Sequence, residues 1–334
     1  MNANQFQTLM ASLFLCTGSL LSFNAQARDV KHFDENKPLT KIAFGSCNFQ
    51  RASQSHWKSI ARKQPDLWIW GGDNIYADHL PVSMRAGEYK FLRDNEWYKK
   101  FRTQFPIVGT WDDHDFGYND VGGNYRDKVK TQKLMLDFFD VPTNSPRRKQ
   151  EGVYYSWTFG PEGKQVKVVT LDLRYFREAP GKGADILGAN QWQWLEREFL
   201  ENTSQLVILV SSSQLVAPIN GAETWSQYSE AREHLFELID KTPGQVIVLS
   251  GDRHFAEVSK VKLKSGKELY DFTASGLTHF SKSDSPNEFR VGERFNEKNF
   301  GLLTLDWSVP NSVAVGFEIN NVKGESLQRL QYQF

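Results

Sequence analysis

Metal-binding and acid–base side chains occur in this chain directly after short apolar segments. These side chains are Cys47, Asp73, Asn74, Tyr76, Asp112, Asp113, His114, Asp115, Asp172, Arg174, Asp252, Arg253 and His254. Thiolate, phenolate and imidazole groups suit transition metals, whereas carboxylates suit harder cations such as calcium. If the fold brings these groups together, they predict a site for multivalent cations.

The sequence Asp112-Asp113-His114-Asp115 is the most specific of these patterns. Three carboxylates beside one imidazole repel one another unless a cation compensates their charge. The Gly-Asp pairs at 72–73 and 251–252 are weaker signals, because Gly-Asp after a strand is most often a simple turn. The prediction of a metal site therefore depends on the turns lying side by side.

Alternating strands and helices would place these turns at one edge of a sheet. Apolar, β-rich runs are found at Lys41–Gly45, Asp66–Trp70, Pro106–Trp111, Val153–Phe159, Val166–Leu173, Leu206–Ser211 and Val246–Ser250. Helical spacing is found at Ser53–Ala61, Gln191–Leu200 and Tyr228–Ile239. Such alternation predicts mainly parallel pairing, with the ligand crevice outside the carboxyl ends of the strands.

The pattern changes after His254 to strands at short spacing. These strands are expected at Val258–Leu263, Glu268–Ala274, Leu302–Trp307 and Val313–Ile319. They add β-meander character and hence predict a mixed α/β fold with mixed sheets. Because we find no linker-like composition and no internal repeat, we expect residues 28–334 to form a single domain.

Composition excludes some classes of function. The chain has 40 basic and 40 acidic residues and a formal net charge of zero, so no specific nucleic-acid partner is implied. Residues 1–27 are typical of a cleavable secretory signal, with an apolar stretch from Leu9 to Phe23 before Ala25-Gln26-Ala27. That stretch is too short to span a bilayer comfortably. We therefore expect an exported protein, periplasmic or extracellular, without a membrane span after cleavage.

Signal cleavage would leave Cys47 as the only thiol, because Cys16 lies within the signal. A lone cysteine in an oxidising compartment needs a reason. One interpretation is a small buried apolar residue at a strand end. The other is a thiolate that serves as a metal ligand or a nucleophile.

The motifs FGSC, GGDNIYAD, TWDDHDFGYND, LDLRYFR, LVSSSQ and LSGDRHF stand in this order along the chain. In kind and order they resemble the alkaline phosphatase D (PhoD-like) family of metallophosphatases, within the calcineurin-like and purple acid phosphatase superfamily. The resemblance covers residues 39–280. It implies a four-layer sandwich of two mixed β-sheets flanked by helices.

The resemblance also implies a binuclear metal centre in which Asp73 bridges two ions. One ion would take Cys47, Tyr76 and His254, a donor set that suits ferric iron. Coordination would then explain why the thiol of Cys47 is kept.

The second ion would take the carboxylates of Asp113 and Asp252, an oxygen-rich set that suits calcium. A further ligand of the related purple acid phosphatases falls near Gln214, whose amide oxygen either coordinates or does not. His279 is the other histidine whose loop could reach the pocket.

Roles toward a phosphate ester are implied in the same way. His114 would contact the phosphoryl group or protonate the leaving group, with Asp115 orienting its ring. Arg174, Arg253 and Asn74 could neutralise charge on the phosphoryl oxygens. For Arg174, an ion pair with a neighbouring acid is an equal alternative.

The implied function is an exported metal-dependent phosphoesterase that acts on phosphomonoesters, phosphodiesters or both through a metal-activated water. One alternative is a non-catalytic phosphate- or metal-binding module on the same scaffold. Another is a hydrolase that uses Cys47 as nucleophile with His114 as its base, but this leaves the carboxylates unexplained.

Overall fold

The computed structural model describes residues 31, 33–34, 36–218, 223–282 and 286–332. The expected signal peptide, residues 1–27, lies outside these ranges. Within them, no helix combines the length and the apolar character needed to cross a membrane.

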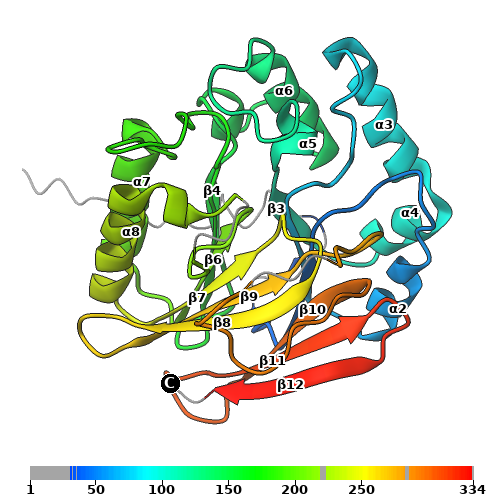
Figure 1. The fold of residues 1–334 in the computed structure, drawn as a ribbon. Helices are drawn as coiled ribbons and strands as arrows, with labels where there is room; N and C mark the ends of the chain where they lie inside the picture. The colour runs from blue at the N-terminus through cyan, green and yellow to red at the C-terminus, as the bar shows by residue number, and fades with distance from the viewer. Residues whose placement is uncertain (1–30, 32, 35, 219–222, 283–285, 333–334) are drawn as a thin grey trace, which may run out of the picture.

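Two six-stranded sheets form the centre of the molecule (Figure 1). The first has the order β12-β11-β10-β1-β2-β3. Its strands are β1 (Lys41–Gly45), β2 (Leu67–Gly71), β3 (Ile107–Thr110), β10 (Asn299–Asp306), β11 (Ala314–Asn321) and β12 (Ser326–Tyr332). The pairs β1–β2 and β2–β3 are parallel, whereas β10 runs antiparallel to β1 and begins a meander through β11 and β12.

The second sheet has the order β4-β5-β6-β7-β9-β8. Its strands are β4 (Tyr155–Phe159), β5 (Val166–Thr170), β6 (Leu206–Ser211), β7 (Gln245–Ser250), β8 (Ala256–Lys262) and β9 (Glu268–Ala274). The four strands β5, β6, β7 and β9 are parallel, and β4 and β8 close the edges in the antiparallel sense. Both sheets are therefore mixed.

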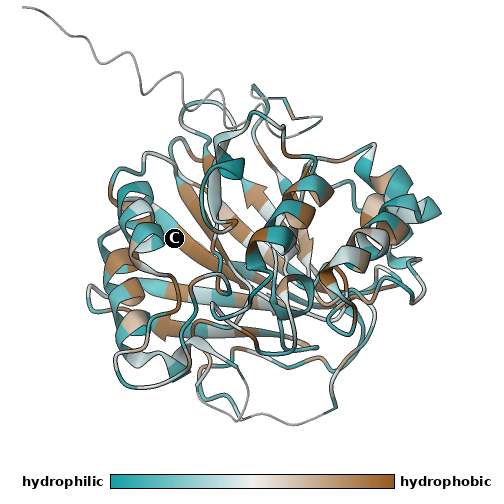
Figure 2. Cartoon of the chain, turned by 90° about the horizontal axis from the view of Figure 1, so that it is seen from above, coloured by the Kyte–Doolittle hydropathy of each residue, from teal (hydrophilic) through white to brown (hydrophobic). Residues whose placement is uncertain are grey.

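Helices cover the outer faces of both sheets (Figures 1 and 2). They are α2 (His56–Arg62), α3 (Val82–Asp94), α4 (Glu96–Arg102), α5 (Asp113–Phe116), α6 (Lys128–Phe138), α7 (Ala189–Leu200) and α8 (Ser229–Lys241), with short 3-10 helices at Pro146–Arg148 and Trp225–Gln227. The helices α7 and α8 pack on the second sheet, and α2 and α4 pack on the first. This arrangement confirms the two mixed, helix-flanked sheets that the resemblance implied.

The main apolar core lies between the two sheets. Phe44 of β1 and Phe317 of β11 meet Ile208 of β6 and Phe272 of β9 there, all 2% exposed or less. The rings of Phe272 and Phe317 stack with their centroids 4.2 Å apart. Because a fully buried side chain of this size contributes about 1.5–3 kcal/mol, this layer fixes one sheet against the other and so fixes the relative positions of their strand ends.

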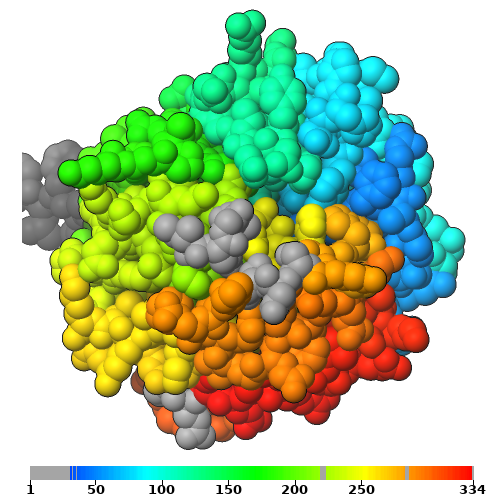
Figure 3. Space-filling model, viewed as in Figure 1, coloured from blue at the N-terminus to red at the C-terminus, as the bar shows by residue number. Residues whose placement is uncertain are grey.

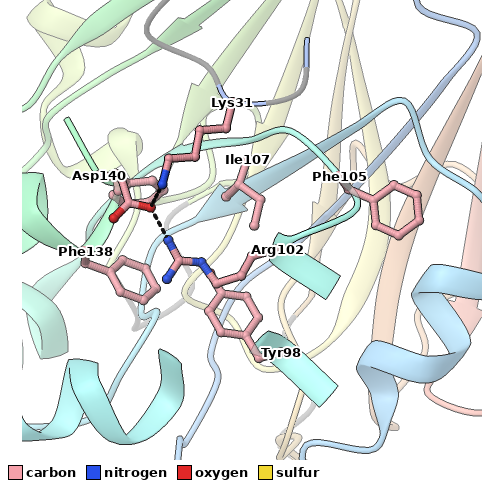
Figure 4. Close-up of a pocket in the computed structure, with 8 residues that line it drawn as sticks. Lys31, Tyr98, Arg102, Phe105, Ile107, Phe138 and Asp140 are labelled. Atoms are coloured by element: carbon pink, nitrogen blue, oxygen red, sulfur yellow. Dashed lines mark hydrogen bonds and ion pairs between the residues drawn. The ribbon is translucent and has the colours of Figure 1, made fainter. Parts of the chain in front are cut away.

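A small cavity of about 30 Å³ lies at the amino end of β3, the edge away from the predicted crevice (Figure 4). In it, Asp140 pairs with Lys31 at 2.8 Å and with Arg102. These ion pairs hold Lys31, the first described residue, against the helical layer. We assign the cavity no chemistry.

Candidate metal centre

The strand ends of the two sheets touch at one edge. The Gly251 amide after β7 donates to the carbonyl oxygen of Ser212 after β6, at 3.1 Å. A Cβ on Gly251 would lie 2.6 Å from the carbonyl oxygen of Gly71 in the other sheet, so only glycine permits this approach. The turns that carry the predicted ligands therefore share one space.

Four of the predicted ligands adopt left-handed backbone conformations. The φ angles of Cys47, Asp73, Asp252 and His254 are 60°, 49°, 68° and 57°. Such conformations cost a non-glycine residue about 1–3 kcal/mol each and tend to occur at functional sites. Here they follow directly on strands β1, β2 and β7, where they turn the chain sharply at the shared edge.

Cys47, Asp73 and His254 form one cluster of possible ligands, with donor atoms all within 4.8 Å of one another. The Cys47 thiol lies 3.6 Å from Asp73 Oδ2. The Tyr76 hydroxyl lies 3.0 Å from the same oxygen and 3.0 Å from His254 Nε2. The four residues predicted for the first ion are thus brought together.

Two further clusters extend from this one. Asp73, Asp113 and His114 form the second, and Asp112, Asp113 and Asp252 the third. Because Asp73 belongs to the first and second clusters and Asp113 to the second and third, the donor groups are continuous. Asp73 is thus common to two groups of possible ligands, and its role as a bridge between two ions stays a prediction.

Burial and repulsion between the carboxylates destabilise the ionised groups of this cluster, so that a bound cation would stabilise them. Burial first, and neighbouring carboxylates second, raise the pKa of Asp73 well above its ordinary value and that of Asp252 to about 8. Burial and Asp73 also raise the pKa of the Cys47 thiol. At Asp113 burial acts in the same direction, but the charges of Arg174 and His114 lower the pKa overall.

The donor set fits bound metal ions. The carboxylates of Asp73, Asp112, Asp113 and Asp252 converge, and the guanidinium groups nearby offset only part of their charge. Asp112 Oδ2 is buried and has no hydrogen-bond partner among the described residues. Because a buried carboxylate oxygen normally has a partner, this oxygen is consistent with a cation in the cluster.

The role predicted for Asp115 is wrong in its geometry. Its carboxylate accepts hydrogen bonds from the backbone amides of Asn74 and Ile75 and from the Tyr89 hydroxyl, at 3.0–3.2 Å. It therefore holds the turn after β2. The acid that faces the His114 ring is instead Asp78, whose Oδ1 lies 3.3 Å from Nδ1.

Asn74, predicted as a substrate contact, makes contacts within the protein through its amide nitrogen. Its side chain is fully buried, and its amide nitrogen donates to the carbonyl oxygen of Thr110 and to Asp115 Oδ2, both at 3.1 Å. Asn74 thus joins the turns after β2 and β3. The Arg253 side chain is 8% exposed; it stacks over Phe255, and its Nη1 lies 3.9 Å from Asp252 Oδ2.

Arg174 takes the ion-pair alternative. It is 1% exposed, and its Nε donates to Asp112 Oδ1 at 2.5 Å. Its two terminal nitrogens both bind the carboxylate of Glu223, which also pairs with Arg177. The Arg174 backbone amide donates to Asp172 Oδ1 at 2.9 Å. Sequence reasoning missed Glu223, which lies far beyond the end of β6, just before the 3-10 helix Trp225–Gln227.

The amide oxygen of Gln214 is buried without a hydrogen-bond partner among the described residues, so both alternatives for it stay open. Its amide nitrogen donates to Glu257 Oε1 and Thr273 Oγ1, both at 2.9 Å, within the second sheet. The structure thus gives it structural contacts with β8 and β9.

His279 does reach the cluster. Its Nε2 lies 3.1 Å from His254 Nε2, and its ring meets the Tyr76 ring edge-on with centroids 5.0 Å apart. The loop is held by the Leu277 amide, which donates to the carbonyl oxygen of Ser46. Figure 3 shows the yellow and orange surface of the later chain meeting the cyan and green surface of the earlier chain.

Comparison with known proteins gives one family and several relatives. A family model described as PhoD-like phosphatase matches residues 42–302. Alkaline phosphatase D of Bacillus subtilis (strain 168) is 22% identical over an alignment of 326 residues, which covers 78% of this chain and 54% of the relative. The chain thus spans about half the length of that curated relative.

Two solved structures share the fold. One, described as the structure of PhoD, has a TM-score of 0.69 and 18% identity, covering 89% of this chain and 69% of that chain. The other, GAP50, described as the anchor in the inner membrane complex of Plasmodium, has a TM-score of 0.61 and 15% identity, covering 89% and 90%. At such identities these matches show the fold alone.

Proposed function

This chain belongs to the PhoD-like phosphatase family, and on that premise we propose that it is an exported, metal-dependent phosphoesterase that hydrolyses phosphomonoesters, phosphodiesters or both. The observation that carries the proposal is the continuous cluster of donor groups at the shared strand edge, with Asp73 common to two of its parts. The expected signal peptide supports export.

The ligands proposed for the first ion are Cys47, Tyr76, His254 and the shared Asp73. Thiolate, phenolate and imidazole favour a transition metal, and we propose ferric iron. All four approach from strand ends or the turns after them, so that the sheets hold them in place before any ion binds.

The ligands proposed for the second ion are the carboxylates of Asp113 and Asp252, again with Asp73. Oxygen donors favour a hard cation, and we propose calcium. Asp112 Oδ2 is a further candidate donor, to which the family resemblance assigned no ligand role. Metal ions bound at such sites make water a better nucleophile and neutralise charge on the phosphoryl group.

His114 is the residue that we propose to act on the leaving group. Its backbone amide is fixed by Asp73 Oδ1 at 3.3 Å and Asp113 Oδ1 at 3.1 Å, and its ring lies against Tyr76 with centroids 4.2 Å apart. Nδ1 faces Asp78, so Nε2 is the atom that would donate a proton to the departing oxygen or hydrogen-bond the phosphoryl group.

Arg174 and Arg253 would have different roles. Arg174 is buried among acids, so we assign it the positioning of Asp112 and the partial neutralisation of Asp113. Arg253 lies nearer the surface and is our candidate for contact with phosphoryl oxygens.

The two alternatives now carry less weight. Cys47 is fully buried, its pKa is raised, and its Sγ contacts Ser46, Asp73 and Ser275, which is the opposite of an activated nucleophile. A binding module keeps some support because fold does not determine function, as the description of GAP50 as an anchor illustrates.

The proposal is tested by p-nitrophenolate release from p-nitrophenyl phosphate and bis-p-nitrophenyl phosphate. The mature protein is prepared with iron and calcium, and a chelated sample serves as control. Turnover that the chelator abolishes supports the proposal, and the ratio of the two rates ranks monoester against diester. If neither substrate is hydrolysed although both metals are bound, the result favours a non-catalytic binding module.

A further inference from the structure

A groove of about 810 Å³ lies beside the carboxylate cluster, between the loops 118–124 and 175–180. We propose that this groove binds the organic part of the substrate and that it selects a neutral, planar group such as an aryl ring. The inference rests on the proposed phosphoesterase function, because it describes what is attached to the phosphoryl group.

The groove begins one hydrogen bond from the proposed metal ligands. The backbone amide of Asp120, in its wall, donates to Asp113 Oδ2 at 2.7 Å. The Gly117 amide donates to the carbonyl oxygen of Asp113, also at 2.7 Å, so that Tyr118 directly follows the helix that carries His114. A group attached to a phosphoryl at the cluster would therefore extend over Tyr118.

The two walls are held together before any ligand binds. The Gly123 amide donates to the carbonyl oxygen of Arg177 at 2.8 Å, and Arg177 Nη1 donates to the carbonyl oxygen of Asp120 at 3.2 Å. A Cβ on Gly122 would lie 2.6 Å from the Arg177 carbonyl oxygen, so glycine permits the close packing of the loops. A preformed groove loses little entropy on binding.

The cations of the groove are already neutralised or hydrogen-bonded. Lys128 Nζ donates to the carbonyl oxygens of Gly123 and Tyr175, at 3.0 and 3.1 Å. Arg177 pairs with Glu223 and donates to the Tyr228 hydroxyl at 2.7 Å. With both cations engaged in this way and the acidic side chains of Asp120 and Glu178 also in the lining, a second phosphate or another anion gains little there, and a group without negative charge is favoured.

The groove offers aromatic surface instead. Tyr118 is 56% exposed although it lines the groove, and its ring is supported edge-on by Tyr125 with centroids 5.2 Å apart. Phe176 adds a second ring to the lining. An exposed, supported ring stacks well on another planar group, which explains the preference that we infer.

The test compares phenyl phosphate with methyl phosphate in wild type, Tyr118→Ala and Tyr118→Phe. We expect Tyr118→Ala to lower kcat/KM for phenyl phosphate about tenfold and to leave methyl phosphate within about twofold, because only the aryl group stacks on the ring. Tyr118→Phe should behave as wild type. Met84→Ala is the matched control, since Met84 is 57% exposed and lies on α3 outside the groove lining.

A binding measurement separates this inference from the proposed function. Calorimetric titration of the metal-loaded protein with phenylphosphonate and methylphosphonate needs no turnover. Tighter binding of phenylphosphonate that Tyr118→Ala removes supports the groove even if neither ester is hydrolysed. Equal affinity for the two phosphonates, or equal losses on both esters, overturns it.

Discussion

The Nε2 atoms of His254 and His279 lie 3.1 Å apart. The Thr278 hydroxyl donates to the carbonyl oxygen of Cys47 at 3.2 Å and accepts from the Phe49 amide at 2.7 Å. We assign the one hydrogen of that hydroxyl to the Cys47 carbonyl, so that the hydroxyl accepts at 3.1 Å from His279 Nδ1, which carries the ring proton in this tautomer. Nε2 of His279 therefore keeps its lone pair toward His254, an arrangement that a shared cation or proton would stabilise.

We predict that His279→Ala weakens the metal centre. Loss of a group in direct contact with a ligand should lower metal affinity or turnover about 10–100-fold. His234→Ala is the control, because His234 is half exposed and pairs with Glu196 away from the site. Metal content after dialysis and kcat/KM are the measurements. If both stay at the control values, His279 is only a neighbour of the centre.

We predict that Asp73→Asn removes both metals, whereas Asp252→Asn removes mainly the second. The reason is that Asp73 belongs to two of the donor clusters and Asp252 to one. Iron and calcium per chain, measured by elemental analysis, distinguish the two variants. Asp73→Asn should also abolish turnover. Retention of iron at wild-type level would contradict the shared role of Asp73.

The sequence predicted those elements whose buried face is apolar. The strands β1, β6 and β9 begin and end where expected: the apolar residues of β1 and β6 are contiguous, and β9 is rich in aromatic and apolar residues. The edge strand β12 was missed, since none of its residues is fully buried and it contains no apolar run. The helix α3 was missed because Arg85 and Glu88 stand on its buried face and break the apolar period.

The site was predictable in its membership but not in its contacts. The strand-end rule explains why Cys47 and Asp73 meet, because β1 and β2 are parallel and end at the same edge. His254 follows β7 of the second sheet and joins them because the two sheets pack together. The contacts of Asp115 depend on the turn after β2 folding back onto its carboxylate, which residue type does not reveal. Glu223 pairs with Arg174 across 49 residues of chain, and no local pattern marks such a contact.

Arg174→Ala should destabilise the protein by about 3–5 kcal/mol, the usual cost of leaving buried charges without their partner. The partners left behind are Asp112 and Glu223, both largely buried. Arg329→Ala serves as control, because its side chain is 71% exposed and should change stability by less than about 0.5 kcal/mol. Urea unfolding of chelated samples measures both. Equal midpoints for the two variants would contradict a structural role for Arg174.

Cys47→Ser should distinguish a thiolate ligand from a nucleophile. A ligand role predicts loss of iron together with loss of turnover, whereas a nucleophile role predicts loss of turnover with iron retained. Thiol alkylation is less informative, because Cys47 is fully buried and would react slowly in either case. Iron content and the visible absorption spectrum of wild type and Cys47→Ser distinguish the two roles.

His56 should make the fold sensitive to acid independently of the metal centre. It is 2% exposed, and burial, followed by the charge of Lys298, lowers its pKa from the ordinary value of 6.5 to about 3. In the unfolded chain the imidazole takes up a proton as pH falls through 6.5, while in the folded protein it stays neutral until about 3. The unfolded state therefore binds more protons in this window, and stability is lost as pH falls.

The prediction is measured by urea unfolding of chelated wild type and His56→Gln between pH 7 and pH 5. Because His56→Gln removes the titration, the advantage of the wild type should shrink by up to about 1.4 kcal/mol per pH unit below the unfolded-state pKa. His234→Gln, at an exposed histidine, should follow the wild type throughout. Parallel curves for wild type and His56→Gln would mean that the folded protein also protonates His56, and hence that α2 opens to water in mild acid.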